Sequence, residues 1–180
     1  MIEQEIKLRF ESVEAARLAV VTAGGRLTHS RRLLDDQLYD AADGSIRNSG
    51  AAVRVRREER ACYLTFKGPV QPGIYKARDE WETSIGDADT IASILEGLGL
   101  RPWFRAQKYR EEYAIGNASI TIDEAPIGVF VEIEGSSKTI DDVAEALGCT
   151  RGDYINESYR RLYVEWCQAN RIDAGDMLFR

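Results

Sequence analysis

The amino-acid sequence predicts an α+β protein in which a few helices pack on an antiparallel sheet. Seven segments alternate between apolar and other side chains with a period of two, which is typical of half-buried strands. Four other segments place apolar residues at helical spacing. Short turns separate several neighbouring strands, and strands connected in this way pair antiparallel.

The predicted strands cover much of the chain up to residue 134. Turn-forming residues separate them, and the expected turn centres are Asp43-Gly44, Gly116-Asn117 and Ala125-Pro126. The strands are predicted at Ile2–Phe10, Ala52–Arg57, Cys62–Lys67, Asp79–Ile85, Ala106–Ile115, Ser119–Asp123 and Val129–Glu134.

The four predicted helices each follow a polar residue that can cap a helix N-terminus. These residues are Ser12 for the first helix, Asp89 or Thr90 for the second, Thr139 for the third and Asp153 for the C-terminal one. No Pro-rich or low-complexity linker divides the elements, so we expect residues 1–180 to form a single domain.

Composition excludes several classes of protein. No apolar run approaches the roughly 20 residues that cross a bilayer, and the first residues do not form a signal peptide. Cys62, Cys149 and Cys167 are too few and too scattered for a disulfide framework, which indicates a cytoplasmic protein. The formal net charge of −6 argues against a protein that coats nucleic acid.

Charged residues recur in pairs of like sign at alternate strand positions, and these pairs point to a ligand. Residues i and i+2 of a strand lie on one face, about 6.5–7 Å apart, so like charges there repel. Glu-x-Glu occurs three times and Arg-x-Arg and Lys-x-Arg once each. Solvent-facing sheet surfaces also carry charge, but they more often mix signs and uncharged polar residues. Carboxylate pairs suit hard divalent cations, and arginine and lysine pairs suit phosphate.

The ordered series of these pairs resembles the CYTH superfamily, also called triphosphate tunnel metalloenzymes. The resemblance runs from Met1 to about Tyr163. It is carried by Glu3-Gln4-Glu5-Ile6-Lys7, Asp36–Asp40, Arg54-Val55-Arg56, Leu64–Pro69, Arg78–Glu82, Lys108-Tyr109-Arg110, Ile122-Asp123 and Glu132-Ile133-Glu134.

This resemblance implies a closed tunnel of eight antiparallel strands with a charged lumen and helices packed outside. It implies phosphate contacts from Lys7, Arg54, Arg56, Lys67, Lys108 and Arg110. It implies that one or two Mg²⁺ or Mn²⁺ ions are held, or a water positioned, by Glu3, Glu5, Glu80, Glu82, Asp123, Glu132 and Glu134. The catalytic residues expected among these are Glu5, Lys7 and Glu132.

Three functions remain open on the sequence. The first is metal-dependent hydrolysis of a triphosphate, either inorganic tripolyphosphate or an organic compound such as thiamine triphosphate or a nucleotide. The second is cyclisation of ATP to cyclic AMP and pyrophosphate, as in class IV adenylate cyclases. The third is non-catalytic binding of polyphosphate or a nucleotide. We favour hydrolysis, because it demands less positioning of the substrate than cyclisation does. The expected partner is a small-molecule triphosphate, with no nucleic acid and no membrane, and a homodimer stays open.

Overall fold

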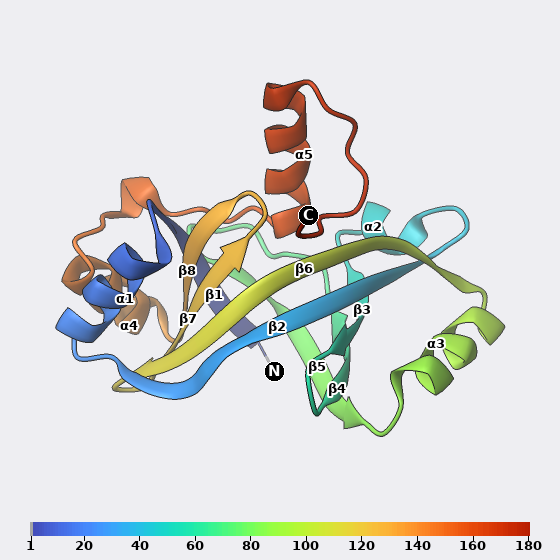
Figure 1. The fold of residues 1–180 in the computed structure, drawn as a ribbon, viewed down its shortest axis with the longest axis horizontal. Coiled ribbons are helices and arrows are strands. Elements are labelled where there is room, and N and C mark those ends of the chain that lie inside the picture. Colours follow the sequence, from blue (N-terminus) through green and yellow to red (C-terminus); the bar gives the residue numbers. More distant parts are fainter. Residues whose placement is uncertain (1) are drawn as a thin grey trace.

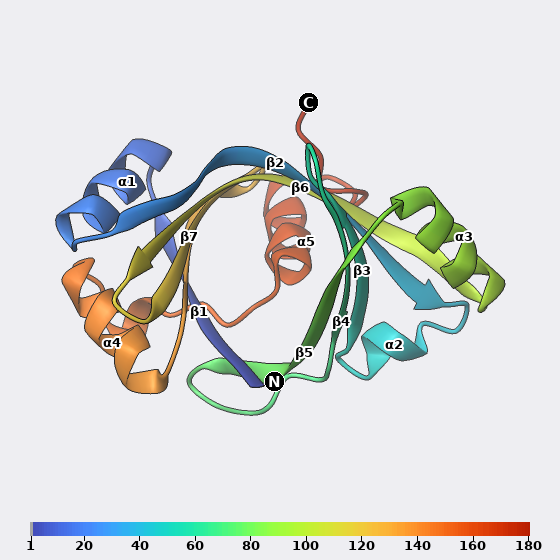
Figure 2. The same cartoon turned by 90° about the horizontal axis from the view of Figure 1, so that it is seen from below.

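Eight antiparallel strands form one closed sheet in the computed structural model, which describes residues 2–180. The order around the ring is β1-β5-β4-β3-β2-β6-β7-β8, and β8 pairs back to β1 (Figures 1 and 2). The strands are β1 (Ile2–Phe10), β2 (Arg26–Ala41), β3 (Ala52–Arg57), β4 (Cys62–Lys67), β5 (Lys76–Ile85), β6 (Leu100–Ile115), β7 (Ala118–Ala125) and β8 (Gly128–Glu134). The predicted fold is confirmed.

The helices lie outside the ring, with α5 across one end of it (Figure 2). On one side α1 and α4 pack against β1, β7 and β8, and on the other α3 packs against β3 and β6. The helices are α1 (Val13–Thr22), α2 (Ser45–Asn48), α3 (Ala88–Gly97), α4 (Ser137–Ala146) and α5 (Tyr159–Asn170), with a 3-10 turn at Arg151–Asp153. No helix in residues 2–180 has the length and apolar character needed to span a membrane.

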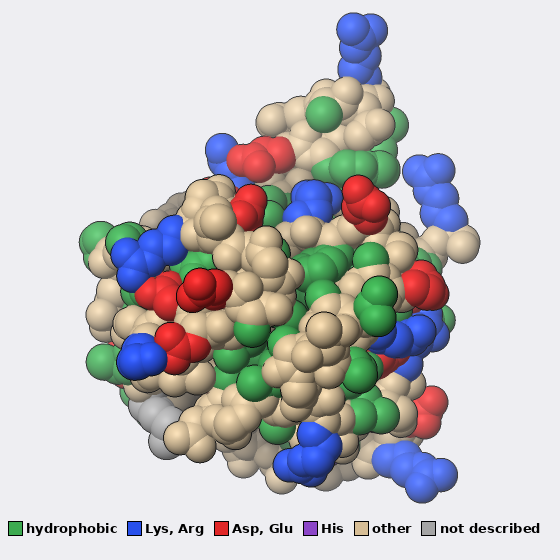
Figure 3. Space-filling view, turned by 90° about the vertical axis from the view of Figure 1, so that its left-hand side faces the viewer, with side chains coloured by type: hydrophobic (Ala, Val, Ile, Leu, Met, Phe, Trp, Pro, Cys, Tyr) green, Lys and Arg blue, Asp and Glu red, His purple; other side chains and the backbone are tan. Residues whose placement is uncertain are grey.

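Most of the hydrophobic core lies between the sheet and its helices, and a smaller cluster that includes Phe104, Phe130 and Met177 lies where α5 and the tail meet the ring. Ile6, Leu8, Ile120 and Ile133 are almost wholly buried beneath α1 and α4. A strand alternates its side chains between two faces, so this outward apolar face leaves the charged residues on the inner face. Figure 3 views the molecule from this side, and shows charged side chains scattered over its surface with α5 projecting above.

The C-terminal tail adds a short stretch of pairing to the free edge of β6. β7 pairs with β6 only from Tyr109 onward. In the part of β6 that precedes Tyr109, the Met177 N–H donates to the Arg105 carbonyl at 2.9 Å, and the Gln107 N–H donates to the Met177 carbonyl at 2.8 Å. The Met177 side chain is buried at the tunnel wall. The tail therefore closes the wall where β7 has ended.

The predicted helices are present, but three begin at other residues than expected. Asp87 caps α3, Ser136 caps α4 and Ser158 caps α5. The C-terminal helix starts late because Ile155 pairs with Lys7 as an isolated β-bridge, which keeps the chain extended before Ser158. The short helix α2 was not predicted, because four residues are too few to show helical periodicity.

Candidate functional site

The inner face of the ring surrounds a cavity of about 850 Å³. Inward-pointing residues of every strand and the start of α5 line it. Of the predicted site residues, those that line this cavity are Glu3, Glu5, Lys7, Arg54, Arg56, Lys67, Glu80, Glu82, Lys108, Arg110, Glu132 and Glu134. The closed ring therefore brings these groups together from positions far apart in the sequence.

Lys7 lies at the centre of one group of charges, between two carboxylates. Its Nζ atom lies 3.1 Å from Glu132 Oε1 and 3.4 Å from Glu5 Oε1. Lys76 of β5 also donates a hydrogen bond to Glu5. Burial opposes charge on Lys7, but Glu132 and Glu5 outweigh it and raise the Lys7 pKa. Lys7 therefore stays a cation inside the protein.

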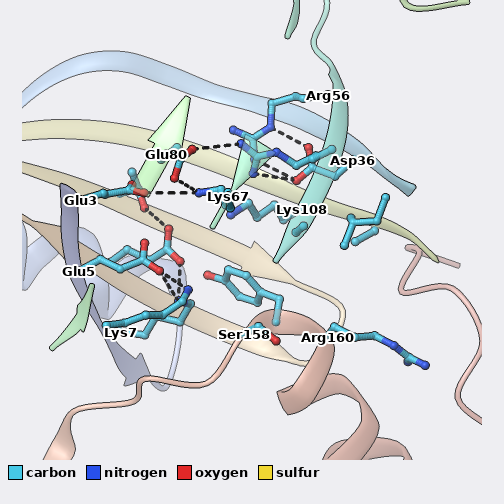
Figure 4. Close-up of a pocket in the computed structure, with 18 of the residues that line it drawn as sticks. Glu3, Glu5, Lys7, Asp36, Arg56, Lys67, Glu80, Lys108, Ser158 and Arg160 are labelled. Carbon is cyan, nitrogen blue, oxygen red and sulfur yellow. Dashed lines mark hydrogen bonds and ion pairs between the residues drawn. The ribbon is translucent and has the colours of Figure 1, made fainter. Parts of the chain in front are cut away.

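A second group lies at the N-terminal end of β1, where Lys67 stands between Glu3 and Glu80 (Figure 4). Burial and a hydrogen bond with Glu80 raise the pKa of Glu3 to about 8. Burial and the charges of Glu5 and Glu80 raise the pKa of Glu134. Two neighbouring carboxyl groups with raised pKa values indicate that more acidic groups gather here than the neighbouring cations balance.

The arginine pair of β3 is held by an acidic residue of β2. Arg56 donates to both oxygens of Asp36, at 2.7 and 2.9 Å, and Arg54 Nη1 lies 3.7 Å from the same carboxylate. The far side of Arg54 donates to Glu82 Oε2 at 3.1 Å. Burial and the charge of Arg56 lower the Arg54 pKa. An anion in the cavity would relieve this repulsion.

Asp123 is the one predicted site residue that does not line the cavity. Its side chain is fully buried, and it accepts hydrogen bonds from Lys108 at 2.6 Å, from Arg110 at 2.6 and 2.7 Å, and from the Tyr159 hydroxyl at 2.8 Å. Burial and the charge of Arg110 lower the Lys108 pKa to about 8. Asp123 thus holds the second basic pair in place from behind.

The two ends of the tunnel differ in chemistry. At the end opposite α5, Arg32 bridges Glu58 and Glu112, and His29 Nδ1 lies 2.9 Å from Glu112 Oε2. His29 keeps 64% of its side chain exposed. At the other end, residues of α5 and the tail join Trp103 of β6 at the rim of the cavity.

Buried polar atoms without hydrogen-bond partners are concentrated around this cavity. Within residues 2–180 they are Arg32 Nη1, Arg54 Nε, Arg160 Nη1 and Asn156 Oδ1. All four residues line the tunnel. Native proteins satisfy nearly all buried polar groups, so a cluster of unsatisfied ones indicates a polar ligand or water. Three of the four are guanidinium donors, which suit an anion.

Three residues of this site were not assigned a role in it from the sequence. Asp36 has Leu34 and Leu38 at its alternate positions, so it forms no charged pair and gives no signal. Lys76 stands four residues before Glu80 in a basic run, which suggests at most a contact at the rim. Tyr159 lies on α5, and only the tertiary fold brings its ring to within 4.5 Å of Lys108 Nζ and 5.4 Å of Lys7 Nζ.

The carboxylates of the tunnel fit a hard divalent cation. Oxygen ligands suit Mg²⁺ and Mn²⁺, and a cation would offset the burial and the charge of Glu80 that raise the pKa of Glu3. No three acidic, His or Cys groups in residues 2–180 already converge on one point as a complete ligand set. A metal would therefore share its coordination with a ligand or water, as Mg²⁺ usually does.

Comparison with known proteins connects this tunnel to one family. Residues 1–159 match the CYTH domain. A Methanocaldococcus jannaschii protein, named for a proposed adenylate cyclase activity, is 27% identical over 173 residues, which cover 90% of this chain and 98% of the relative. An adenylate cyclase of Aeromonas hydrophila is 26% identical over 89% of this chain and 87% of its own length.

Two solved structures share the fold. One, from Vibrio parahaemolyticus, has a TM-score of 0.79 at 20% identity and covers 90% of this chain and 97% of its own. The other is a Hippeastrum protein proposed to be an adenylyl cyclase and described as having a dominant triphosphatase activity. Its TM-score is 0.68 at 19% identity, with 91% of this chain and 96% of the other covered.

Proposed function

Because the chain belongs to the CYTH domain family, whose members are divalent-metal-dependent enzymes, we propose that it hydrolyses a triphosphate with Mg²⁺ or Mn²⁺. The observation that carries the proposal is the cluster of unsatisfied guanidinium atoms around one closed, charged cavity. The triphosphatase activity described for the Hippeastrum protein supports hydrolysis as the reaction. Tripolyphosphate, thiamine triphosphate and nucleoside triphosphates are the candidate substrates.

The basic residues bind the phosphate chain in this proposal. Lys7, Arg54, Arg56, Lys67, Lys108 and Arg110 all reach the cavity. Phosphoryl transfer is accelerated mainly by positioning and by neutralising the negative charge that spreads over the transferred group. Asp36 and Asp123 hold the two arginine-containing pairs, so these cations meet the ligand with little rearrangement.

The acidic residues hold the metal and orient the attacking water. Glu3, Glu5, Glu80, Glu82, Glu132 and Glu134 face the cavity and would supply ligands. Asp123, which was also expected to be a ligand, instead accepts hydrogen bonds from Lys108 and Arg110. When bound, a divalent ion neutralises phosphate charge and lowers the pKa of a coordinated water. Glu132 and Glu5 keep Lys7 charged, so that Lys7 can stabilise the leaving or attacking oxygen.

One assay tests the reaction. Purified protein with Mg²⁺ or Mn²⁺ is given tripolyphosphate, thiamine triphosphate and ATP, and phosphate, pyrophosphate and cyclic AMP are quantified separately. Release of phosphate supports hydrolysis. If cyclic AMP and pyrophosphate are the main products from ATP, the second candidate, adenylate cyclase, replaces it. The names of the Methanocaldococcus and Aeromonas relatives favour that candidate.

Replacing the acidic residues of the tunnel distinguishes an enzyme from a non-catalytic binding protein. Pure anion binding would be stronger without the acidic pairs, because they repel phosphate. Glu5→Gln is therefore expected to abolish turnover in an enzyme, whereas in a passive binder it leaves phosphate binding equal or tighter. Glu11→Gln, at an exposed position just after β1, is the matched control.

We further propose a cytoplasmic location and a small-molecule triphosphate as partner, with residues 1–180 as one domain. The three cysteines are free, which agrees with a reducing compartment. Gel filtration of the purified chain decides between a monomer and a homodimer.

A further inference from the structure

The end of the tunnel next to α5 differs from the rest of the cavity in being partly apolar. We call this region the α5 mouth, and define it by the lining residues Leu38, Arg47, Trp103, Asn156, Arg160 and Met177. At the opposite end, Arg32 is paired with Glu58 and Glu112. An organic group attached to a triphosphate would therefore meet a surface that is partly apolar and partly cationic at the α5 mouth.

A β-bulge directs Trp103 toward this mouth. Leu38 pairs with Phe104 and Tyr39 pairs with Pro102, which leaves Trp103 without an opposite residue on β2. Strict alternation would put Trp103 and Phe104 on different faces, but both line the cavity. A bulge that re-aims a side chain commonly lies beside a functional site.

Two guanidinium groups lie on the Trp103 ring. The Arg47 Cζ atom is 5.2 Å from the ring centroid, and the Arg160 Cζ atom is 5.8 Å from it. Arg47 is neutralised by Asp40, at 2.7 Å. In residues 2–180 no ion pair to Arg160 is formed, and its side chain extends from α5 away from the charged centre around Lys67 (Figure 4). The mouth therefore combines an aromatic surface with positive charge.

The mouth also offers one unsatisfied donor and one unsatisfied acceptor. Arg160 Nη1 is buried without a partner within the described chain. Asn156 donates through Nδ2 to the Ile74 carbonyl at 2.7 Å, which leaves its Oδ1 atom facing no donor in the same part of the chain. A ring with its own acceptor and donor groups would satisfy both atoms.

We propose that the α5 mouth is a subsite for the organic group of a triphosphate ester, and that it selects an uncharged heteroaromatic ring over a cationic one. This inference rests on the proposed function, since the tunnel must hold the triphosphate. A neutral base can stack on Trp103 and accept from Arg160. A cationic ring, such as the thiazolium of thiamine triphosphate, is repelled by the charge of Arg160, which no ion pair within residues 2–180 neutralises.

The test compares ligands with and without the ring. Binding of tripolyphosphate, ATP and thiamine triphosphate is measured by isothermal titration calorimetry in EDTA, where turnover does not interfere. Trp103→Ala is expected to raise the Kd of ATP about tenfold, or about 1.4 kcal/mol, and to leave the Kd of tripolyphosphate unchanged. Trp81→Ala is the matched control, because Trp81 is exposed outside the barrel, and it should change neither value.

The charge argument has its own variant. Arg160→Gln is expected to raise the Kd of ATP and to lower the Kd of thiamine triphosphate relative to that of ATP. The Kd of tripolyphosphate should change little. The subsite is refuted if Trp103→Ala raises the Kd values of ATP and tripolyphosphate equally, or if it changes neither Kd. It is also refuted if the wild type binds thiamine triphosphate more tightly than ATP. If the wild type binds no triphosphate in EDTA and also releases no phosphate with Mg²⁺ or Mn²⁺, the proposed function itself fails. Circular dichroism of each variant excludes misfolding as the cause.

Discussion

Replacing Asp36 with asparagine tests whether the buried guanidinium groups of Arg54 and Arg56 need a neighbouring negative charge, which a bound anion could also supply. Asp36 accepts two hydrogen bonds from Arg56 and lies 3.7 Å from Arg54 Nη1. All three side chains are at most 15% exposed. Asp36→Asn preserves the shape of the side chain and removes a negative charge that both arginines share.

The expected destabilisation is large. Removing one partner of a buried ion pair costs about 3–5 kcal/mol, since the remaining charge is left uncompensated. At about 2–4 °C per kcal/mol for a chain of this size, the Tm should fall by roughly 6–20 °C. Tripolyphosphate bound beside Arg54 and Arg56 replaces the lost charge. The difference in Tm between variant and wild type should therefore narrow when tripolyphosphate is present.

Thermal unfolding followed by circular dichroism, with and without tripolyphosphate, measures both effects. Asp35→Asn is the matched control, because Asp35 is the adjacent residue on the outer face and pairs with Arg105, whose side chain is 45% exposed. The Asp35 side chain is 17% exposed, and this partly exposed pair is expected to contribute about 1 kcal/mol, well below the cost at Asp36. An unchanged Tm for Asp36→Asn, or a difference that tripolyphosphate does not narrow, would refute the reasoning.

Four further predictions follow from the same structure. Chelation with EDTA should abolish turnover and excess Mg²⁺ restore it, as a phosphate-release assay would show; activity that persists in EDTA contradicts a metal site. Ile133→Ala should destabilise by about 2–5 kcal/mol in urea unfolding, because Ile133 is fully buried beneath the helices. Tyr159→Phe removes the 2.8 Å hydrogen bond to Asp123 and should lower stability by about 1 kcal/mol in the same assay. Hydrogen bonds from Arg151, Tyr154 and Tyr75 lower the pKa of Asp141 to about 2, so its contribution to stability is complete above pH 4 and is lost as the pH falls toward 2. Asp141→Asn should therefore reduce the fall in the free energy of unfolding between pH 4 and pH 2, and an unchanged fall argues against this role.

Much of the tunnel was predictable from the sequence because the alternation of side chains within a single strand decides which residues share a face. In β1 and β8 the period-two pattern places Glu3, Glu5 and Lys7 on one face and Glu132 and Glu134 on another strand's equivalent face. The pattern alone leaves open whether that face meets solvent or a lumen. Closure of the ring decides it, and closure is a property of pairing between distant strands.

The remainder depends on tertiary contacts or on irregular pairing. Trp103 enters the cavity through a bulge, which alternation does not predict. The first half of β2 was not predicted, because the polar run from Thr28 to Arg32 does not alternate with apolar residues. The start of α5 is set by the bridge between Lys7 and Ile155, which joins residues far apart in the chain.

The pairing of β1 with β8 also bears on how the protein is made. β1 must wait for Gly128–Glu134, which is synthesised much later, before its second edge is occupied, and contacts of such long sequence separation form slowly. During that interval the unclosed sheet presents its lysines, arginines and carboxylates to water. Unpaired strand edges favour aggregation, and charged side chains on such strands oppose it, so the charges required by the finished tunnel also protect its precursor.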